Sequence, residues 1–415
     1  AVVFLDGDVA YNMGPNGRPV RAGLQAVRAR RLDMLNNPAV LVRAALDPAA
    51  RVGAVRSEAG VQVADVTVPG GETVTLALEA ASGLPAWVRW MAHDENLGDV
   101  TFRTRFTGYL PVKGVMLPMG YSTVIDFRGV VQNKLYVDRN AIDESSDDLT
   151  APADVRAAAA PVPQAPAVEA RRVGQGVWLL QGNGGANSIL FEFADHLTMF
   201  EAPSSQGWTK ALIERARATV PGKPLTELVV SHHHFDHTGG IRQAIAEGLT
   251  IIAHKGTEGL FREIALRKGT IAPDALGANP KPLRFKAVDD HLRLGDAAMQ
   301  VDLYHVVSNS HMAEALFAYV PKDRLLVEGD FFDVGWELYW WQKTYADNIA
   351  YRQLQVESDV PVHGRVVPIT QALQDIERMT KAAEAVCTRT QAAGVFTPGC
   401  PVKTATPVVT GSSAR

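Results

Sequence analysis

The chain has 415 residues and a net charge of −4, and 47% of its residues are hydrophobic while 21% are charged. This length gives room for about two or three domains with a sizeable core. The charge balance argues against nucleic acid as a partner, and no apolar run reaches the roughly 20 residues that cross a bilayer, so no transmembrane segment is expected.

The first 150 residues predict a smaller N-terminal α+β domain of unknown role. Its opening lacks the charged, apolar and small-residue zones of a signal peptide, as a mature or trimmed chain would. Residues 18–38 have the apolar spacing of a helix, and later stretches such as VQVADVTVP and ETVTLALEA alternate apolar with polar residues between turns. This alternation is typical of an antiparallel sheet with one solvated face.

A change of composition separates this region from the rest of the chain. Residues 151–170 are almost entirely Ala, Pro and Val, which favours an extended interdomain linker. Beyond it, strand-like stretches such as NSILFEF and LTELVVS alternate with helical ones such as TKALIERARAT and IRQAIAEG. Interleaving of this kind indicates a layered α/β domain, which we expect over residues 171–400, followed by a C-terminal tail at 401–415.

The stretch VVSHHHFDHTGG, residues 229–240, is the most informative segment of the sequence. It follows a strand-like run and precedes a helical one, so it is expected in a loop at the carboxyl end of a strand, where α/β proteins often build sites. Alternate residues of extended chain point the same way, which directs His232 and His234 toward one metal ion. Asp236 and His237, on the turn into the helix, aim at a second ion, while His233 falls out of phase. The Gly-Gly pair that follows is predicted to let the backbone turn sharply.

The segment SHHHFDHTGG resembles the signature of the metallo-β-lactamase-fold metallohydrolases, an HxHxDH motif, and the resemblance covers roughly residues 171 to 370. The later ligands of that family have counterparts here in the expected order. The resemblance implies an αββα sandwich, preceded in this chain by the smaller, mainly antiparallel α+β domain. Carried over by position, it also implies that the first metal would be held by His232, His234 and His311, the second by Asp236, His237 and His363, and both by a bridging Asp330.

The chemistry implied by this resemblance is that of a dinuclear site with two zinc ions per chain, with Fe or Mn as alternatives. Imidazole and carboxylate suit zinc, and an open position beside the protein ligands is typical of catalytic sites. Two ions about 3.5 to 4 Å apart can share a water and lower its pKa towards about 7, so that a metal-bound hydroxide attacks the substrate. Asp236 is expected to be the catalytic residue that orients this nucleophile.

The predicted function is therefore that of a metal-dependent hydrolase. Its substrate would be a small, partly apolar molecule with an ester, lactone, thioester or amide bond, β-lactams included. Some lactamases have Ser or Cys where this chain has Asp330, whereas a bridging aspartate is more typical of the thioesterases, lactonases, phosphodiesterases and diiron oxidoreductases of the fold. Lactamase activity thus does not follow from the resemblance. A diiron oxidoreductase and a non-catalytic binding protein stay open as alternatives.

Two further features near the predicted ligands allow more than one interpretation. In GWELYWWQKTY, the residues Trp336, Trp340 and Trp341 either line an apolar substrate pocket or pack in a core. Asn309, two residues before His311, either donates to an oxyanion or caps a turn.

The two cysteines, Cys387 and Cys400, are compatible with one disulfide or with two free thiols. A disulfide would favour a periplasmic or secreted location over the cytoplasm. The N-terminal domain could dimerise the enzyme, which leaves a homodimer as an open prediction.

Overall fold

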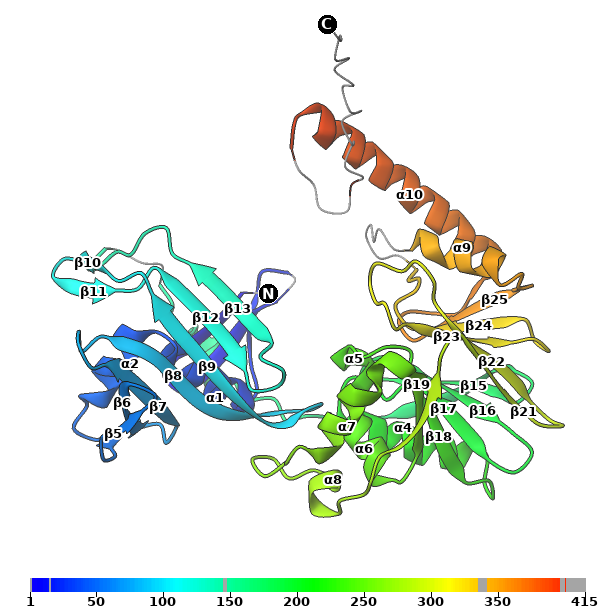
Figure 1. Cartoon of the computed structure of the whole chain (residues 1–415), viewed down its shortest axis with the longest axis horizontal. Helices are drawn as coiled ribbons and strands as arrows, with labels where there is room; N and C mark the ends of the chain where they lie inside the picture. Colours follow the sequence, from blue (N-terminus) through cyan, green and yellow to red (C-terminus); the bar gives the residue numbers. More distant parts are fainter. Residues whose placement is uncertain (1, 15, 145–147, 335–341, 396–399, 401–415) are drawn as a thin grey trace, which may run out of the picture. The chain divides into compact units, whose positions relative to one another are not determined.

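The computed structural model describes residues 2–14, 16–144, 148–334, 342–395 and 400. The chain forms two compact units, the first made of residues 1–165 and 268–272 and the second of residues 166–267 and 273–415. Figure 1 shows the first unit mainly in blue and cyan and the second in green to red. No helix in the described ranges combines the length and the apolar character that crossing a bilayer requires.

The first unit is rich in antiparallel strands. They are β1 (Val3–Asp6), β2 (Val9–Met13), β3 (Pro19–Arg21), β4 (Arg51–Val52), β5 (Arg56–Glu58), β6 (Val61–Thr67), β7 (Thr73–Glu79), β8 (Pro85–Asp94), β9 (Gly98–Thr107), β10 (Leu110–Val112), β11 (Val115–Leu117), β12 (Gly120–Ile125) and β13 (Val131–Tyr136). The largest sheet has the order β13-β12-β9-β8-β7-β6-β4, with β5 also paired to β6. A three-stranded sheet, β1-β2-β3, and the hairpin β10-β11 accompany it.

Helices cover one face of the large sheet in this unit. They are α1 (Leu24–Leu35) and α2 (Pro38–Ala45), and α3 (Ala153–Ala157) follows the sheet. The side chains of Leu41, Val88 and Trp90 meet in the core between α1, α2 and the sheet. Asn37 caps α2 through its side chain, and Pro38 takes the first helical position, where its missing N–H is not needed.

Two segments of the first unit differ from the sequence prediction. The helix predicted over residues 18–38 is shorter, because Pro19–Arg21 pairs with β2 as strand β3 and a helix starts only at Leu24. Within the predicted linker, α3 forms because Val155 is buried in a small cluster with Val9 and Tyr11. Residues 151–152 and 158–167 of that stretch lie outside helices and strands, and β14 begins at Val168.

The second unit is a sandwich of two sheets. Its strands are β14 (Val168–Gly174), β15 (Val177–Gly182), β16 (Ser188–Glu192), β17 (Leu197–Phe200), β18 (Leu225–Val229), β19 (Thr250–His254), β20 (Arg284–Val288), β21 (His291–Gly295), β22 (Gln300–His305), β23 (Leu316–Val320), β24 (Leu325–Glu328), β25 (Ser358–Pro361) and β26 (Val367–Pro368). The strands β14 to β20 form one sheet and β21 to β26 the other, each in sequence order. Buried side chains of both sheets, such as Phe191, Ile252, Val301 and Val327, fill the core between them.

Helices flank the sandwich of the second unit (Figure 1). They are α4 (Gln206–Thr219), α5 (Phe235–Thr238), α6 (Ile241–Ala246), the 3-10 turn η1 (Lys255–Thr257), α7 (Glu258–Leu266), α8 (Ala275–Ala278), α9 (Lys343–Tyr351) and α10 (Ile369–Ala392). Helices α4 and α6 contact the first sheet, and α9 and α10 cover the second through a separate apolar cluster. The predicted αββα sandwich, preceded by a mainly antiparallel unit, is confirmed.

The two cysteines are joined. Cys387, on the buried side of α10, forms a disulfide with Cys400, and their Cα atoms lie 5.3 Å apart. Of the two possibilities left open by the sequence, the structure therefore has the disulfide.

A buried ion pair anchors the chain that follows α7. The guanidinium of Arg242, on α6, is fully buried and lies 2.5 Å from the carboxylate of Asp274. It also donates to the carbonyl oxygens of Ile264 and Arg267, each at 2.9 Å. Because Arg242 and Asp274 are both buried, the pair is costly to break from one side.

We expect the substitution Arg242→Ala to lower the free energy of unfolding by about 3–5 kcal/mol, since it leaves the Asp274 carboxylate buried without a counter-charge. Arg262→Ala, which removes an exposed arginine paired with Glu258 one helical turn away, is the control and should leave the urea midpoint almost unchanged. Urea unfolding followed by circular dichroism checks both. Equal effects of the two substitutions would contradict the role of the buried pair.

Candidate metal centre

The histidine-rich loop begins where strand β18 ends. This strand lies between β17 and β19 and is parallel to both, so the loop leaves the carboxyl end of the sheet, as predicted. The backbone N–H of Val230 donates to the carbonyl of Ile252 at 2.9 Å, which extends the pairing by one residue. The Thr238 hydroxyl then donates to the carbonyl oxygens of His233 and His234, at 3.2 and 2.8 Å, and ties the loop to α5.

The two glycines at the end of the loop are needed for a different reason than predicted. Their φ angles are −55° at Gly239 and −103° at Gly240, values that any residue adopts. A Cβ atom on Gly239 would collide with the backbone of Ser204, and one on Gly240 with the side chain of Thr209. Close approach of the loop to α4, rather than a left-handed backbone, therefore explains the Gly-Gly pair.

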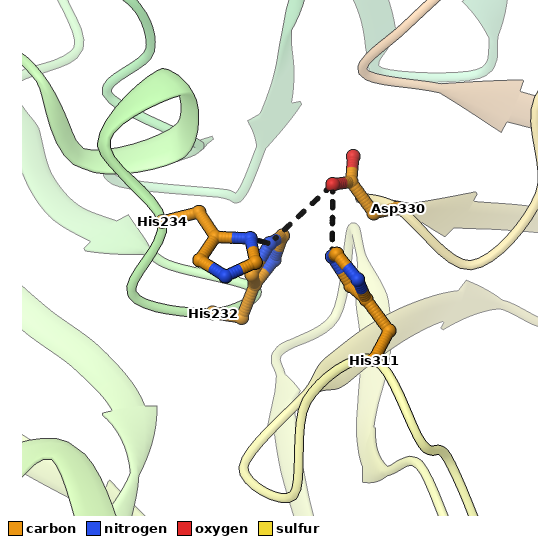
Figure 2. Close-up of side chains that lie close together, drawn as sticks. All are labelled: His232, His234, His311 and Asp330. Carbon is orange, nitrogen blue, oxygen red and sulfur yellow. Dashed lines mark hydrogen bonds and ion pairs between the residues drawn. The ribbon is translucent and has the colours of Figure 1, made fainter. Parts of the chain in front are cut away.

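Four side chains gather into a first group: His232, His234, His311 and Asp330 (Figure 2). One potential ligand atom from each lies within 4.8 Å of all the others. The Nε2 atom of His232 is 3.1 Å from Nδ1 of His234, and Nε2 of His311 is 3.0 Å from Oδ2 of Asp330. His232 is buried, whereas the other three are partly exposed, so the group opens to solvent on one side.

A second group lies against the first and consists of Asp236, His237, Asp330 and His363. Its ligand atoms also lie within 4.8 Å of one another. His237 Nε2 is 2.9 Å from Oδ1 of Asp330, and His363 Nε2 is 3.3 Å both from that oxygen and from Oδ2 of Asp236. His237 is fully buried at the base of this group.

The carboxylate of Asp330 belongs to both groups. Its Oδ2 atom faces His232 and His311, and its Oδ1 atom faces His237 and His363. The loops that supply these side chains follow β18, β22, β24 and β25, which belong to both sheets of the sandwich. All seven side chains that the sequence nominated are thus brought together, and His233 lies in neither group.

The other residues predicted near the site have different outcomes. The side-chain oxygen of Asn309 accepts from the backbone N–H groups of His311 and Met312, at 2.7 and 3.4 Å, so Asn309 caps the turn that carries a predicted ligand. Residues Trp336, Trp340 and Trp341 lie outside the described residues.

Burial and charge set the protonation of the central side chains. Burial lowers the pKa of His232 to about 3, and the nearby His237 adds to this effect. Burial also disfavours the charged form of His237, but contacts with the carboxylates of Asp330 and Glu201 outweigh it and raise its pKa to about 10. Burial alone would raise the pKa of Asp330, yet its histidine partners hold it far below its ordinary value. The surroundings therefore favour the neutral form of His232 and, beside the carboxylates of Asp330 and Glu201, the charged form of His237.

Comparison with known proteins identifies the family. Residues 182–339 match the model of the metallo-beta-lactamase superfamily. The domain that carries the site belongs to this superfamily. The match spans the predicted ligands from His232 to Asp330 and ends before His363. No curated protein matches the sequence.

Several solved structures resemble the chain over about half its length. The DIM-1 metallo-beta-lactamase has 17% sequence identity and a TM-score of 0.42, with 53% of this chain and 100% of that chain covered. A metallo-beta-lactamase from Pontibacter korlensis has 15% identity and a TM-score of 0.41, with 52% and 99% covered. FIM-1 from Pseudomonas aeruginosa, in a mono-zinc form, has 15% identity and a TM-score of 0.41, with 52% and 96% covered.

The residues of this metallo-beta-lactamase domain fit divalent cations. In each group two ring nitrogens face each other, His232 with His234 at 3.1 Å and His237 with His363 at 3.2 Å. Two neutral imidazoles that face each other in this way share at most one N–H, whereas both lone pairs can bind one cation. Nitrogen and carboxylate oxygen ligands suit zinc and also iron. A ligand imidazole is neutral, so a cation here would replace the second proton of His237.

One functional residue was missed by sequence reasoning. Glu201, fully buried directly after β17, accepts a hydrogen bond from the backbone N–H of Ser231 at 3.0 Å and lies 3.5 Å from Nδ1 of His237. A carboxylate behind a ligand histidine fixes the orientation of the ring and strengthens it as a ligand. The signal in the sequence is the acidic residue of MFEAP, directly after an apolar strand. Glu201 is therefore placed to orient the His237 ring in the metallo-beta-lactamase domain.

The substitution Glu201→Gln should weaken metal binding at the second group by about 10–100-fold, because the amide cannot balance the charge behind His237. The control is Glu227→Gln, which changes a partly buried glutamate on β18 away from both groups. Titration of zinc against a competing chelator measures the effect. Unchanged zinc affinity in the Glu201 variant would show that this carboxylate does not support the ligand.

Proposed function

We propose that the second unit is a metal-dependent hydrolase that holds two divalent cations, zinc in particular, and cleaves an ester, lactone, thioester or amide bond. The ligands to one cation would be His232, His234 and His311, and those to the other Asp236, His237 and His363, with Asp330 shared. The proposal is supported above all by the position of the Asp330 carboxylate, because each of its two oxygens faces a different group of imidazoles.

When bound, a pair of such cations supplies Lewis acidity and a water of lowered pKa. The chain itself contributes fixed positions, since each ligand follows a strand of a well-packed sandwich. It also contributes a carboxylate that can orient a water. Burial would raise the pKa of Asp236, but the hydrogen bond with His363 and the charge on His237 lower it to about 2. The side chain of Asp236 is therefore ionised at neutral pH, and with 35% of it exposed it can accept a hydrogen bond from a water and orient it.

An exposed aromatic ring beside the ligands supports a partly apolar substrate. Phe235 lies between His234 and Asp236 in the chain, and 70% of it is exposed. Such a ring offers an apolar surface next to the site, on which the uncharged part of a small molecule can pack. The predicted lining by Trp336, Trp340 and Trp341 stays a prediction.

The substitution Asp236→Ala should reduce kcat/KM at least about 100-fold on any substrate that the wild type cleaves, because it removes both a ligand and the carboxylate that orients the water. We expect the metal content to fall below two ions per chain at the same time. A panel of chromogenic esters, lactones, thioesters and cephalosporins, with elemental analysis of protein purified without added metal, measures both.

Asp195→Ala is a matched control, because Asp195 lies in the exposed turn between β16 and β17, where its carboxylate pairs with His196, and it belongs to neither group. It should retain the activity and the metal content of the wild type. Retained cleavage in the Asp236 variant would contradict the proposed role. Iron as the purified metal, together with redox activity and no hydrolysis, would replace the proposal with the diiron oxidoreductase.

A further inference from the structure

The large sheet of the first unit has one face that the helices do not cover. On this face, strand alternation places Trp87 and Arg89 of β8 beside Arg103 and Arg105 of β9. Trp87 pairs with Arg105 and Arg89 with Arg103 in the register of the two strands. The residue between Trp87 and Arg89, Val88, points to the opposite face and packs in the core with α1 and α2.

A pocket of about 510 Å³ opens on this face. Its lining includes Trp87, Arg103, Arg105 and Tyr109. The Tyr109 hydroxyl donates to the carbonyl oxygen of Pro85 at 2.7 Å, which holds this part of the wall in place. The volume is that of a site for a small molecule, and the lining combines aromatic surface with a few charged groups, as such sites do.

The arginines of this face differ in their partners. Arg89 makes two hydrogen bonds with the carboxylate of Glu58, at 2.9 and 3.2 Å, and its guanidinium lies 5.0 Å from the centre of the Trp87 ring. Arg103 and Arg105 are exposed and make no ion pair or side-chain hydrogen bond within the described residues, although, after Arg89 and Arg56, the charge of Arg103 contributes to the lowered pKa of Glu58. Two adjacent guanidinium groups in the pocket are therefore available to a ligand.

One acidic side chain also lines the pocket. Glu79, at the end of β7, accepts a hydrogen bond from the Ser82 hydroxyl at 2.9 Å. Since Arg103 and Arg105 together carry two positive charges, the lining keeps an excess of positive charge in spite of Glu79. An anion is the ligand that this balance favours.

We propose that this pocket binds a small organic anion, whose oxyanion group is held by Arg103 and Arg105 and whose apolar part packs against Trp87. The planar guanidinium binds carboxylates and phosphate-type groups through paired N–H donors. Residues two apart on a strand point the same way, so both arginines reach into the same space. The proposal is independent of the hydrolase proposed for the second unit.

Isothermal titration calorimetry on the full chain tests this with three probes: benzoate, phenylphosphonate and inorganic phosphate. The variant R103A/R105A should lose at least about tenfold in affinity for phenylphosphonate, because it removes the charge-assisted hydrogen bonds. The matched control R51A/R56A removes the same charge from β4 and β5 of the same sheet, outside the pocket lining, and should stay within about twofold. Binding of probes to the second unit is common to all variants and cancels in the comparison.

Two further substitutions test the roles of Glu79 and Trp87 in the pocket. Glu79→Gln should raise the affinity for all three probes, because it removes a repulsive charge from the lining. Trp87→Ala should weaken phenylphosphonate and benzoate more than inorganic phosphate, which has no apolar part. Should the alanine double variant unfold, R103Q/R105Q repeats the test with polar side chains.

Equal losses in R103A/R105A and R51A/R56A would overturn the proposal, since they would reveal attraction to net charge alone. Absence of saturable binding of every probe up to about 10 mM by the wild type would overturn it as well.

Discussion

The shared carboxylate of Asp330 is the constraint around which the second unit is built. A largely buried carboxylate is costly unless positive charge or hydrogen-bond donors face each of its oxygens. Here imidazoles from both sheets face it, His232 and His311 on one side and His237 and His363 on the other. The chain can satisfy this only if loops distant in sequence meet at one point, and the close-packed core between the two sheets holds those loops there.

Buried residues that do not reach solvent support the side chains of the two groups from behind. Glu201 holds the loop through Ser231 and lies behind His237, while the Ser231 hydroxyl lies 2.9 Å from Nδ1 of His232. A Cβ on Gly329 would collide with that hydroxyl, which explains the glycine directly before Asp330. The positions of the ligands thus depend on a buried layer beneath them, and changes in that layer would be felt at the site.

The sequence could predict a layered α/β domain from its alternating strands and helices. Through the resemblance of its HxHxDH segment to a known family, with later counterparts in the expected order, the sequence could also imply the αββα sandwich and nominate the seven clustered side chains. It could not find Glu201, since a single glutamate after a strand is distinguished from a surface residue only by the packing around it. For the same reason it misread Gly239 and Gly240, whose neighbours Ser204 and Thr209 are distant in sequence.

The arginine pocket of the first unit was equally hidden from the sequence. The net charge of −4 does not indicate where charged side chains without an ion-pair partner lie in the structure. Only the register of β8 and β9 places Trp87 opposite Arg105. Strand alternation alone predicts a solvated face but not which of its charges are neutralised by neighbours. Ion pairs across strands decide that, and they depend on the three-dimensional register.

The central claim is that the side chains around Asp330 hold two metal ions. Crystals grown with zinc, with data collected on both sides of the zinc absorption edge, test it most directly. The account predicts two anomalous peaks that adjoin opposite oxygens of Asp330, one beside His232, His234 and His311 and the other beside Asp236, His237 and His363. A map without peaks at Asp330, or with zinc bound only elsewhere on the chain, would contradict it.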